Sequence, residues 1–505
     1  MWQRFNKEDL LIICHYLGVL IFFSSFALAI PLVTGILFAE WKAVSYYLIT
    51  LGLSLIIGNS MRLVKIQPGR LSRRQALAVT GLSWLVLAFL ASIPLYLSGH
   101  YTNYADALFD GVSGLTTTGA SVVADLDHMS YADNMFRFVM HYVGGLGLIV
   151  VALSIGLFGR HTSTSLYNSE GRSDHVVPNI VQSTRFISGF STIIIAIATF
   201  ISLSIFLLLG MEGPRAFLHA LWLSISGFMT GGFAPMADSV RYYHSVTIDG
   251  LLAVLMLMGA INFCIYLEVW RGRLYEFFKD IESHVLVIWL SIMVIVITAS
   301  LASSKLFSDL PSMLARGIFM VIAAATTTGF QTITSNQLTT AFSSGAFLAL
   351  AILMVVGGSA GSTAGGIKFR RIGLITKSIA STVKEALAPD SALVVVTYWN
   401  IGRRVINPAI VKESMTVFTL FVVTIVAGTL VGIAHGYEAN IAIFESCAMT
   451  SNGGLTSGIV VPGMPLGLEV VYVLQMWAGR LEFVTLIALL VEVAVSIVPA
   501  KKISM

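Results

Sequence analysis

Residues 325–330 read ATTTGF, a run of threonines that ends in glycine and phenylalanine within a largely apolar chain. Related stretches are TTTGA at 116–120, MTGGF at 229–233 and SNGGL at 451–455. Aligned on their common glycine, the four also share an aromatic residue ten positions earlier and an aliphatic residue eleven positions earlier. The aromatic residues are Phe109, Trp222, Phe319 and Phe444. The sequence therefore contains four copies of one unit.

The composition around these copies is that of a membrane protein. Of 505 residues, 56% are hydrophobic and only 11% are charged, whereas soluble domains carry about 25% charged residues. Apolar runs of about 20 residues, long enough to cross a bilayer as helices, recur along the chain. We expect full spans at 11–38, 43–63, 75–98, 134–158, 185–210, 246–270, 284–303, 342–380 (interrupted), 408–435 and 466–498.

Basic residues mark alternate connections between these spans. The clusters are Arg4/Lys7, 62–74, 160–185, 271–279, 368–412 and Lys501/Lys502, while the other set of connections is richer in Asp and Glu. Because Lys and Arg are retained on the cytoplasmic side of membranes, the basic set and both termini are predicted to be cytoplasmic.

Each copy reads as a span, a half-crossing helix, a Thr/Gly loop and a second span. The half-crossing segments start near Asp106, His219, Arg316 and Ile441. About ten residues at 1.5 Å each make about 15 Å of helix, half the hydrocarbon thickness. The carbonyl end of such a helix lies in mid-membrane and carries partial negative charge, which favours a cation.

The loops that follow are the candidate cation site. Non-helical backbone at membrane depth must be buried in protein or line a watery path, and rings of carbonyl oxygens can replace the hydration shell of a monovalent ion. Carboxylates, the ligands of divalent ions, do not occur in the four loops. The alternative is that these small residues only allow close helix packing. The candidate ligands are Thr116, Thr117, Thr118, Gly119, Met229, Thr230, Gly231, Gly232, Thr326, Thr327, Thr328, Gly329, Ser451, Asn452, Gly453 and Gly454.

A second glycine run interrupts the second span of the third copy. Five glycines in ten residues should unwind a helix, and an unwound segment just inside the loops could obstruct the passage and move aside as a gate. A simple packing kink is the alternative. The glycines are Gly357, Gly358, Gly361, Gly365 and Gly366.

Arg480 stands near the middle of the last span, 26 residues after Gly454. A charge at that depth costs about 2.5 to 3.5 kcal/mol unless it meets water or a partner. We predict that Arg480 points into the cavity below the loops; an ion pair with a neighbouring carboxylate is the alternative. Asp110 and Glu445, nine residues before their glycines, are expected to cap the half-crossing helices; attraction of cations to the outer mouth is the alternative.

These motifs resemble the Trk/Ktr/HKT superfamily of potassium transporters, most closely its TrkH branch. Residues 113–120 resemble the family's first filter, 325–330 its third, 357–368 its intramembrane gating loop and 479–482 the motif of its last helix. The second and fourth loops depart from the pattern, but the glycine is present in all four, which implies preference for potassium. The resemblance also implies a homodimer and a cytoplasmic regulatory subunit of the nucleotide-binding RCK type.

The expected fold is an all-α polytopic membrane protein in which four repeats surround one pore in pseudo-fourfold arrangement. We place an extension of two helices at 1–72 and the repeats at 73–165, 166–282, 283–400 and 401–505. The expected function is gated potassium uptake across a bacterial inner membrane, with lipid as surroundings and with no enzyme activity, organic cofactor or nucleic acid partner. The alternative is a proton- or sodium-coupled symporter with alternating access, and both passive and coupled flux fit these residues.

Overall fold

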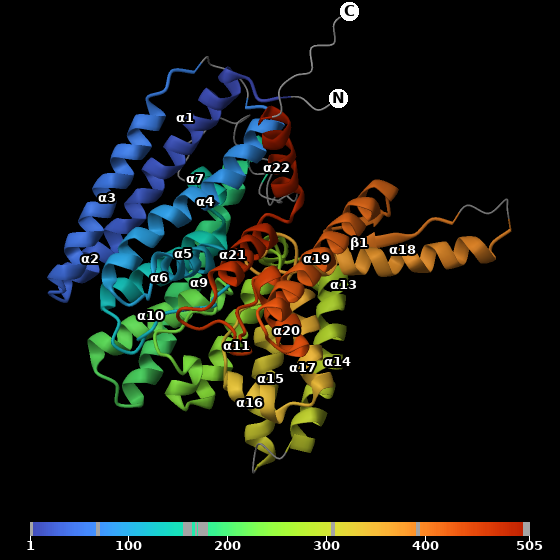
Figure 1. Ribbon diagram of the computed structural model, residues 1–505. Coiled ribbons are helices and arrows are strands. Elements are labelled where there is room, and N and C mark those ends of the chain that lie inside the picture. The colour runs from blue at the N-terminus through green and yellow to red at the C-terminus, as the bar shows by residue number, and fades with distance from the viewer. Residues whose placement is uncertain are drawn as a thin grey trace, which may run out of the picture.

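Helices make up most of the part of the chain that the structure, a computed structural model, describes (Figure 1). The structure describes residues 4–66, 71–154, 164–166, 169, 180–304, 309–389 and 394–497. Most of the basic cluster at 160–185, together with Lys501 and Lys502, lies outside these residues. The two ends of the described chain meet, since the Phe5 N–H donates to Ser496 Oγ at 3.0 Å.

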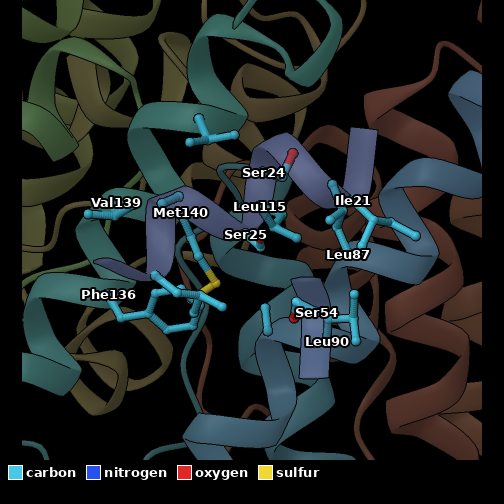
Figure 2. A pocket seen from close by; sticks show the side chains of 14 residues that line it. Ile21, Ser24, Ser25, Ser54, Leu87, Leu90, Leu115, Phe136, Val139 and Met140 are labelled. Atoms are coloured by element: carbon cyan, nitrogen blue, oxygen red, sulfur yellow. The ribbon is translucent and has the colours of Figure 1, made fainter. Parts of the chain in front are cut away.

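The first two spans form a helical hairpin that packs against the rest of the molecule. Helices α1 (Lys7–Ser24) and α2 (Ala29–Leu37) are joined by a 3₁₀ turn, η1 (Ser25–Leu28), and α3 (Trp41–Arg62) returns beside them. Gly18 and Gly58 let α1 and α3 touch, because a Cβ on either would overlap the opposite backbone. Below the 3₁₀ turn is an apolar cavity of about 60 Å³ (Figure 2), lined partly by Leu87 and Phe136 of the first repeat.

The four repeats follow in chain order. The first comprises α4 (Arg73–Ser98), α5 (Tyr104–Leu115), α6 (Tyr131–Leu146) and α7 (Leu148–Ser154). The second comprises α9 (Ile180–Leu208), α10 (Gly213–Phe228), η2 (Ser239–Tyr243), α11 (Val246–Ala260), α12 (Phe263–Trp270) and α13 (Leu274–Lys279). The third comprises α14 (Ile281–Ser304), α15 (Leu310–Ala325), α16 (Ser335–Ala341), α17 (Ser344–Val355) and α18 (Phe369–Leu387). The fourth comprises α19 (Pro408–Ala434), α20 (Ala439–Ser451), α21 (Leu466–Arg480) and α22 (Val484–Ile497).

The expected spans are present as helices, which makes the chain a multi-pass membrane protein. Among the residues that the structure describes, six helical segments are long and apolar enough to cross a bilayer: 7–37, 41–62, 73–98, 180–208, 281–303 and 408–434. Two more expected spans are bent helix pairs, α6 with α7 at 82° and α11 with α12 at 96°. The last span is also broken, between α21 and α22. The sequence predicted an interruption only at 342–380, so its account of the second spans was incomplete.

The half-crossing helices, called pore helices below, are α5, α10, α15 and α20. Two of them begin earlier than the apolar pattern indicated: α10 starts at Gly213 instead of His219, and α15 starts at Leu310 instead of Arg316. Both carry proline in their first turn, where the missing N–H leaves no helix bond unmade. These first turns thus extend the two helices beyond the segments that the apolar pattern indicated.

One extension leaves the helical bundle. Helix α18 and the antiparallel strands β1 (Thr397–Trp399) and β2 (Arg403–Val405) project away from the other helices (Figure 1). The strands are paired from Thr397 with Val405 to Trp399 with Arg403. The proposed border between the third and fourth repeats, at 400/401, falls in the turn of this hairpin.

Candidate functional site

The four pore helices end in the same way. In each, the residue before the filter glycine donates its N–H to a carbonyl five residues earlier, and the residue before that donates to a carbonyl three residues earlier. This is the Schellman motif. The longer bonds are Thr118 to Ser113 at 2.9 Å, Gly231 to Ser226 at 2.8 Å, Thr328 to Ala323 at 2.9 Å and Gly453 to Ala448 at 2.8 Å.

The turn residue of this motif is left-handed in every repeat. Its φ is +55° at Thr117, +49° at Thr230, +51° at Thr327 and +55° at Asn452. Glycine normally occupies this place, and a branched residue there is strained by about 1 to 2 kcal/mol. Strain repeated at equivalent positions requires surrounding contacts that hold it. The degenerate fourth loop therefore has the same backbone turn as the others.

The filter glycines form a closed ring. A Cβ added to Gly119 would overlap the carbonyl oxygen of Gly231, one on Gly232 that of Thr328, and one on Gly454 that of Thr118. A Cβ on Gly329 would come within 2.9 Å of the carbonyl oxygen of Gly453. Each loop thus abuts the next, and the fourth abuts the first. The sequence predicted that these loops converge on one axis, and the structure brings them together.

Most filter hydroxyls are engaged with the protein. Thr116, Thr326 and Ser451 donate to carbonyls of the preceding helical turn at 2.8, 2.7 and 2.6 Å. Thr118 and Thr328 then bond to the first two of these hydroxyls at 2.8 and 2.7 Å. Met229 turns its side chain against Gly145 of α6. The side-chain hydroxyls of these loops are therefore already bonded to protein groups, which leaves the peptide carbonyls as candidate ligands.

The glycine run in the third repeat lies directly against these turns. Between α17 and α18 the chain is non-helical, with φ of +50° at Gly358, +70° at Gly361 and +68° at Gly366. The Gly365 N–H donates to Thr327 Oγ1 at 2.7 Å, and the Thr363 hydroxyl lies 3.1 Å from Thr230 Oγ1. The predicted unwinding is confirmed, and the loop is bound to the left-handed threonines of two repeats.

The same loop is fixed to the break in the second repeat. The Ser359 N–H donates to Ala260 O at 2.8 Å and the Thr363 N–H to Gly259 O at 3.1 Å. The Thr363 hydroxyl also lies 2.8 Å from Gly259 O and 3.2 Å from Phe228 O. The non-helical segment is therefore a loop held in place by several hydrogen bonds to the second repeat. A simple helix kink would not require these bonds.

Arg480 completes this layer from the last span. Its guanidinium donates to Thr117 Oγ1 at 3.2 Å, to Thr363 O at 3.1 Å and to the carbonyls of Gly144 and Gly145 at the broken end of α6. Arg480 and the glycine loop together line a cavity of only about 40 Å³. The arginine thus lies below the four loops and touches the glycine loop. Its neighbour Glu482 pairs instead with Arg371 of α18 at 2.5 Å.

A family model described as TrkH, cation transport protein, matches residues 48–497. The chain belongs to the TrkH family. It is 28% identical over 486 residues to an uncharacterized cation transporter of Methanocaldococcus jannaschii, covering 96% of each chain. It is 28% identical over 505 residues to the Trk system potassium uptake protein TrkH of Halomonas elongata, covering 95% of this chain and 98% of that one. The crystal structure of the potassium transporter TrkH from Vibrio parahaemolyticus superposes with a TM-score of 0.81 at 24% identity, over 95% of this chain and 98% of that one.

This TrkH-family chain also contains a buried arginine near the loops that was not predicted from the sequence. Arg137 of α6 is 1% exposed. It donates to Asp110 Oδ2 at 3.2 Å, to Ser121 Oγ at 2.9 Å and to Ala234 O at 3.4 Å, and its guanidinium lies 4.0 Å from the centre of the Phe233 ring. It therefore ties together the segments that leave the first and second filter loops. The sequence did offer one signal for this role, since Arg137 is a charged residue inside an expected membrane span.

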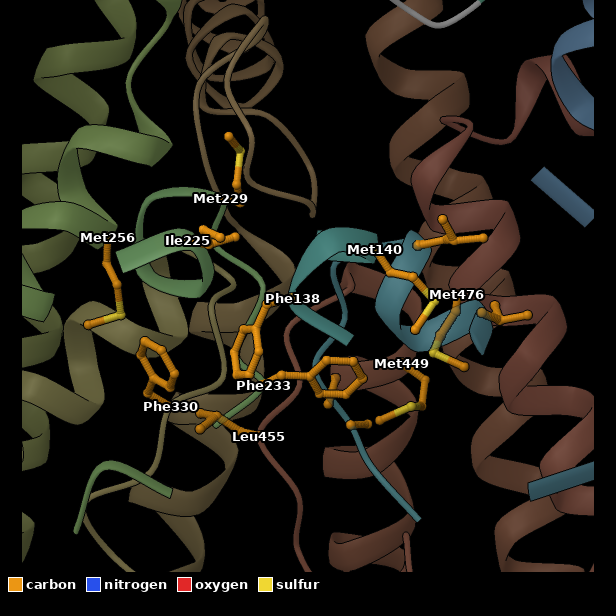
Figure 3. Packing of buried hydrophobic residues seen from close by; sticks show 14 of the residues in the cluster. Phe138, Met140, Ile225, Met229, Phe233, Met256, Phe330, Met449, Leu455 and Met476 are labelled. Atoms are coloured by element: carbon orange, nitrogen blue, oxygen red, sulfur yellow. The ribbon is translucent and has the colours of Figure 1, made fainter. Parts of the chain in front are cut away.

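Two further side chains support the loops that lack the threonine triplet. In the second repeat the His141 ring fills the place of a Cβ on Gly231 and stacks on Phe233 with centroids 4.3 Å apart. In the fourth repeat the sulfur of Met354 lies 3.1 Å from the Cβ position of Gly453. Figure 3 shows Phe233, Phe330 and Leu455, each following a filter glycine, within a layer of buried methionines. His141 was given no role from sequence, because only the fold places it behind a filter loop.

The expected capping roles of Asp110 and Glu445 are wrong. The Asn103 side chain caps α5, and Asp110 accepts hydrogen bonds from Arg137 and from the Tyr101 hydroxyl at 2.8 Å. Glu445 accepts from the Ser457 backbone N–H at 2.8 Å and from the Thr456 hydroxyl at 2.8 Å. Both carboxylates lie beyond the first turn of their helices, where they bind the segments around the filter instead of the helix N-terminus.

Proposed function

We propose that this protein takes up potassium ions across the cell membrane through the passage enclosed by its four filter loops. The observation that carries the proposal is the closed ring, in which each filter glycine lies against a carbonyl of the next repeat. The relatives from Halomonas elongata and Escherichia coli that are named Trk system potassium uptake proteins support the choice of ion.

The proposed ligands are the peptide oxygens of residues 116–119, 229–232, 326–329 and 451–454. Carbonyl dipoles of this kind replace the hydration shell of a monovalent cation. The four pore helices point their carbonyl ends at the same place and add partial negative charge. A site with no carboxylate suits an alkali ion better than a calcium or magnesium ion.

In this proposal the residues below the filter are a gate in its closed position. Gly357, Gly358, Gly361, Gly365 and Gly366 allow the loop to fold under the filter, and Arg480 adds a positive charge that repels the ion. The cavity that remains, about 40 Å³, holds at most a few water molecules. Opening then requires that the loop leave Thr230 and Thr327 and that Arg480 leave Thr117.

Flux through proteoliposomes tests the proposal. With purified protein and imposed potassium, sodium and pH gradients, we expect a reversal potential that follows potassium alone. A reversal potential that also follows pH would favour the proton-coupled symporter, and one that also follows sodium would favour a sodium-coupled symporter. Absence of potassium flux in proteoliposomes that contain folded protein, with the Arg480→Ala variant included to open the gate, would overturn the proposal.

We also propose that the chain is a homodimer in a bacterial inner membrane, with both termini in the cytoplasm and an RCK-type regulatory subunit bound to the cytoplasmic face. The relatives' name, Trk system, supports a multicomponent assembly. The connection at 367–412 is the proposed docking region for the regulatory subunit. Loss of copurification with the RCK-type protein after charge reversal of Arg403 and Arg404 would support that region, and unchanged copurification would exclude it.

A further inference from the structure

A polar cavity of about 460 Å³ lies where the first, third and fourth repeats meet, beside the break between α21 and α22. Its volume is within the range of ligand pockets, which measure about 300 to 1,000 Å³. The arginines that line it are Arg73 at the start of α4 and Arg370 and Arg371 at the start of α18. Guanidinium groups from two repeats therefore border one space.

The carboxylates of this cavity do not balance its cations. Among the described residues that line it, only Glu413 and Glu482 carry a carboxylate. Glu482 is paired with Arg371 at 2.5 Å, and it also borders the 40 Å³ cavity below the filter, where Lys368 is a further cation. Glu413 is exposed on α19. The positive charge in excess favours an anion as the occupant of the large cavity.

Arg371 has donor capacity that the protein leaves unused. The residue is 8% exposed. Its Nη2 donates to Glu482 Oε2, whereas its Nη1 has no hydrogen-bond partner among the residues that the structure describes. Buried donors are nearly always paired with an acceptor, and an anion beside this guanidinium supplies one.

The donor set suits a phosphate group in particular. The planar fork of arginine matches two phosphate oxygens and binds them together. A phosphate group also has enough oxygens to meet several arginines at once, whereas a carboxylate has two. The hydroxyl groups of Ser165 and Thr485 in the cavity wall donate to the carbonyls of Leu71 and Ser169 at 3.2 and 3.1 Å. Recognition of the anion therefore rests on the arginines.

We propose that this cavity binds a phosphate group through Arg73, Arg370 and Arg371. Inorganic phosphate and the phosphomonoester headgroup of a lipid share this chemistry. Both have access, because Arg73 is exposed and the cavity lies at the face of the basic connections. The expected ligand is an anion with at least three free oxygens.

The site is adjacent to the proposed gate. Glu482 and Phe483, at the break in the last span, are left-handed with φ of +56° and +62°, a strained conformation that neighbouring contacts must hold. Arg371 follows the glycine loop, and Glu482 stands two residues after Arg480. A phosphate group that takes Arg371 from Glu482 removes the ion pair between these segments. Resting on the proposed function, this loosens the closed gate and raises potassium flux.

Equilibrium dialysis of the purified full-length chain against radiolabelled inorganic phosphate in chloride buffer tests the site. We expect saturable binding that weakens about tenfold in Arg371→Gln, which loses a charge-assisted contact. Binding should also weaken in Arg73→Gln, whose exposed position makes misfolding no explanation. The matched control is Lys65→Gln, an exposed cation outside the cavity lining, which should bind as the wild type does. No saturable binding, or equal affinity in the wild type and both arginine variants, would overturn the proposal.

Two further measurements identify the source of the phosphate and separate this site from the proposed function. In nanodiscs, displacement of the label by phosphatidic acid but not by phosphatidylcholine assigns the site to a lipid headgroup, and retention of the label assigns it to free phosphate. Potassium flux in proteoliposomes should rise with added phosphate in the wild type and be insensitive to it in Arg371→Gln; a wild type that does not respond would overturn the link to the gate. Because dialysis does not depend on ion flux, failure of the potassium proposal leaves the phosphate site independently testable.

Discussion

At the residue scale, the chain places threonine three times in a backbone region that threonine rarely adopts. Thr117, Thr230 and Thr327 are left-handed, and each is held by a contact from the layer below: Arg480, Thr363 and the Gly365 N–H. A conformation that costs about 1 to 2 kcal/mol persists only when neighbours fix it. In the proposed function, the contacts that close the gate are therefore also the contacts that hold the filter loops in shape.

Replacing Gly329 by serine should lower ion selectivity. Gly329 has φ of +96°, and a Cβ there would come within 2.9 Å of the Gly453 and Gly454 backbone. A loss of about 1.4 kcal/mol of differential binding would reduce the preference for potassium over sodium about tenfold. Bi-ionic reversal potentials measure this ratio. Gly345→Ser, at a site with open space around the Cβ, should leave it unchanged, and an unchanged ratio in Gly329→Ser would contradict the filter assignment.

His141 should restrict Gly231 to glycine. In Gly231→Ala the new methyl group overlaps the imidazole ring, so we expect lower thermal stability and lower potassium selectivity. The double variant Gly231→Ala/His141→Ala should recover part of both, because removal of the ring makes room. A double-mutant cycle on the free energy of unfolding measures the coupling between the two residues. Residues in contact usually couple by about 0.5 to 3 kcal/mol, and we expect about 1 kcal/mol here. Additive effects would show that the two residues do not meet.

At the element scale, all four second spans break below the filter. Gly144, Gly259 and Gly479 each pack on a carbonyl four residues before a filter glycine, at Leu115, Phe228 and Thr450. In the third repeat Gly357 packs on the side chain of Thr327. A Cβ at any of these positions would force the span away from its pore helix. The breaks are thus a property of the repeat, and the break of the third repeat is the longer glycine loop that we propose as the gate.

Arg480→Ala should increase potassium flux. The variant removes the positive charge below the filter and the bonds to Thr117, Thr363 and the α6 carbonyls. We expect several-fold faster uptake in proteoliposomes. Arg403→Ala, on the exposed strand β2, is the control for a general loss of positive charge. Equal flux in wild type and Arg480→Ala would remove Arg480 from the gate.

The variant Thr363→Val tests the hydrogen bonds that hold the glycine loop in place, and it keeps the size of the side chain. Valine keeps the volume of threonine but lacks the hydroxyl that contacts Thr230, Phe228 and Gly259. Each lost hydrogen bond is worth about 1 kcal/mol, so the closed position weakens and flux should rise. Thr340→Val, an exposed site on α16 whose hydroxyl bonds only locally, should have no effect. Slower flux in Thr363→Val would mean that the hydroxyl stabilises an open state instead.

At the scale of the whole molecule, the proposal requires that the pore helices begin on the outer face and that α18 projects into the cytoplasm. His128 lies on the first of these faces and is largely exposed, and Lys384 lies on α18. In a variant with Cys14, Cys264 and Cys447 replaced by serine, His128→Cys should react with an impermeant thiol reagent in intact cells. Lys384→Cys should react only after permeabilisation, and the reverse pattern would invert the topology.

From the amino-acid sequence alone we could predict the membrane class, the four repeats, the Thr/Gly loops, the unwound glycine run and the mid-span arginine. These follow from apolar length, internal similarity and backbone preference, which are local and additive along a chain. The three-dimensional fold was needed to show that each filter glycine lies against the next repeat and that Arg137 and His141 support the loops. Such contacts join residues up to hundreds of positions apart, and no local preference encodes which distant side chain will fill a given space.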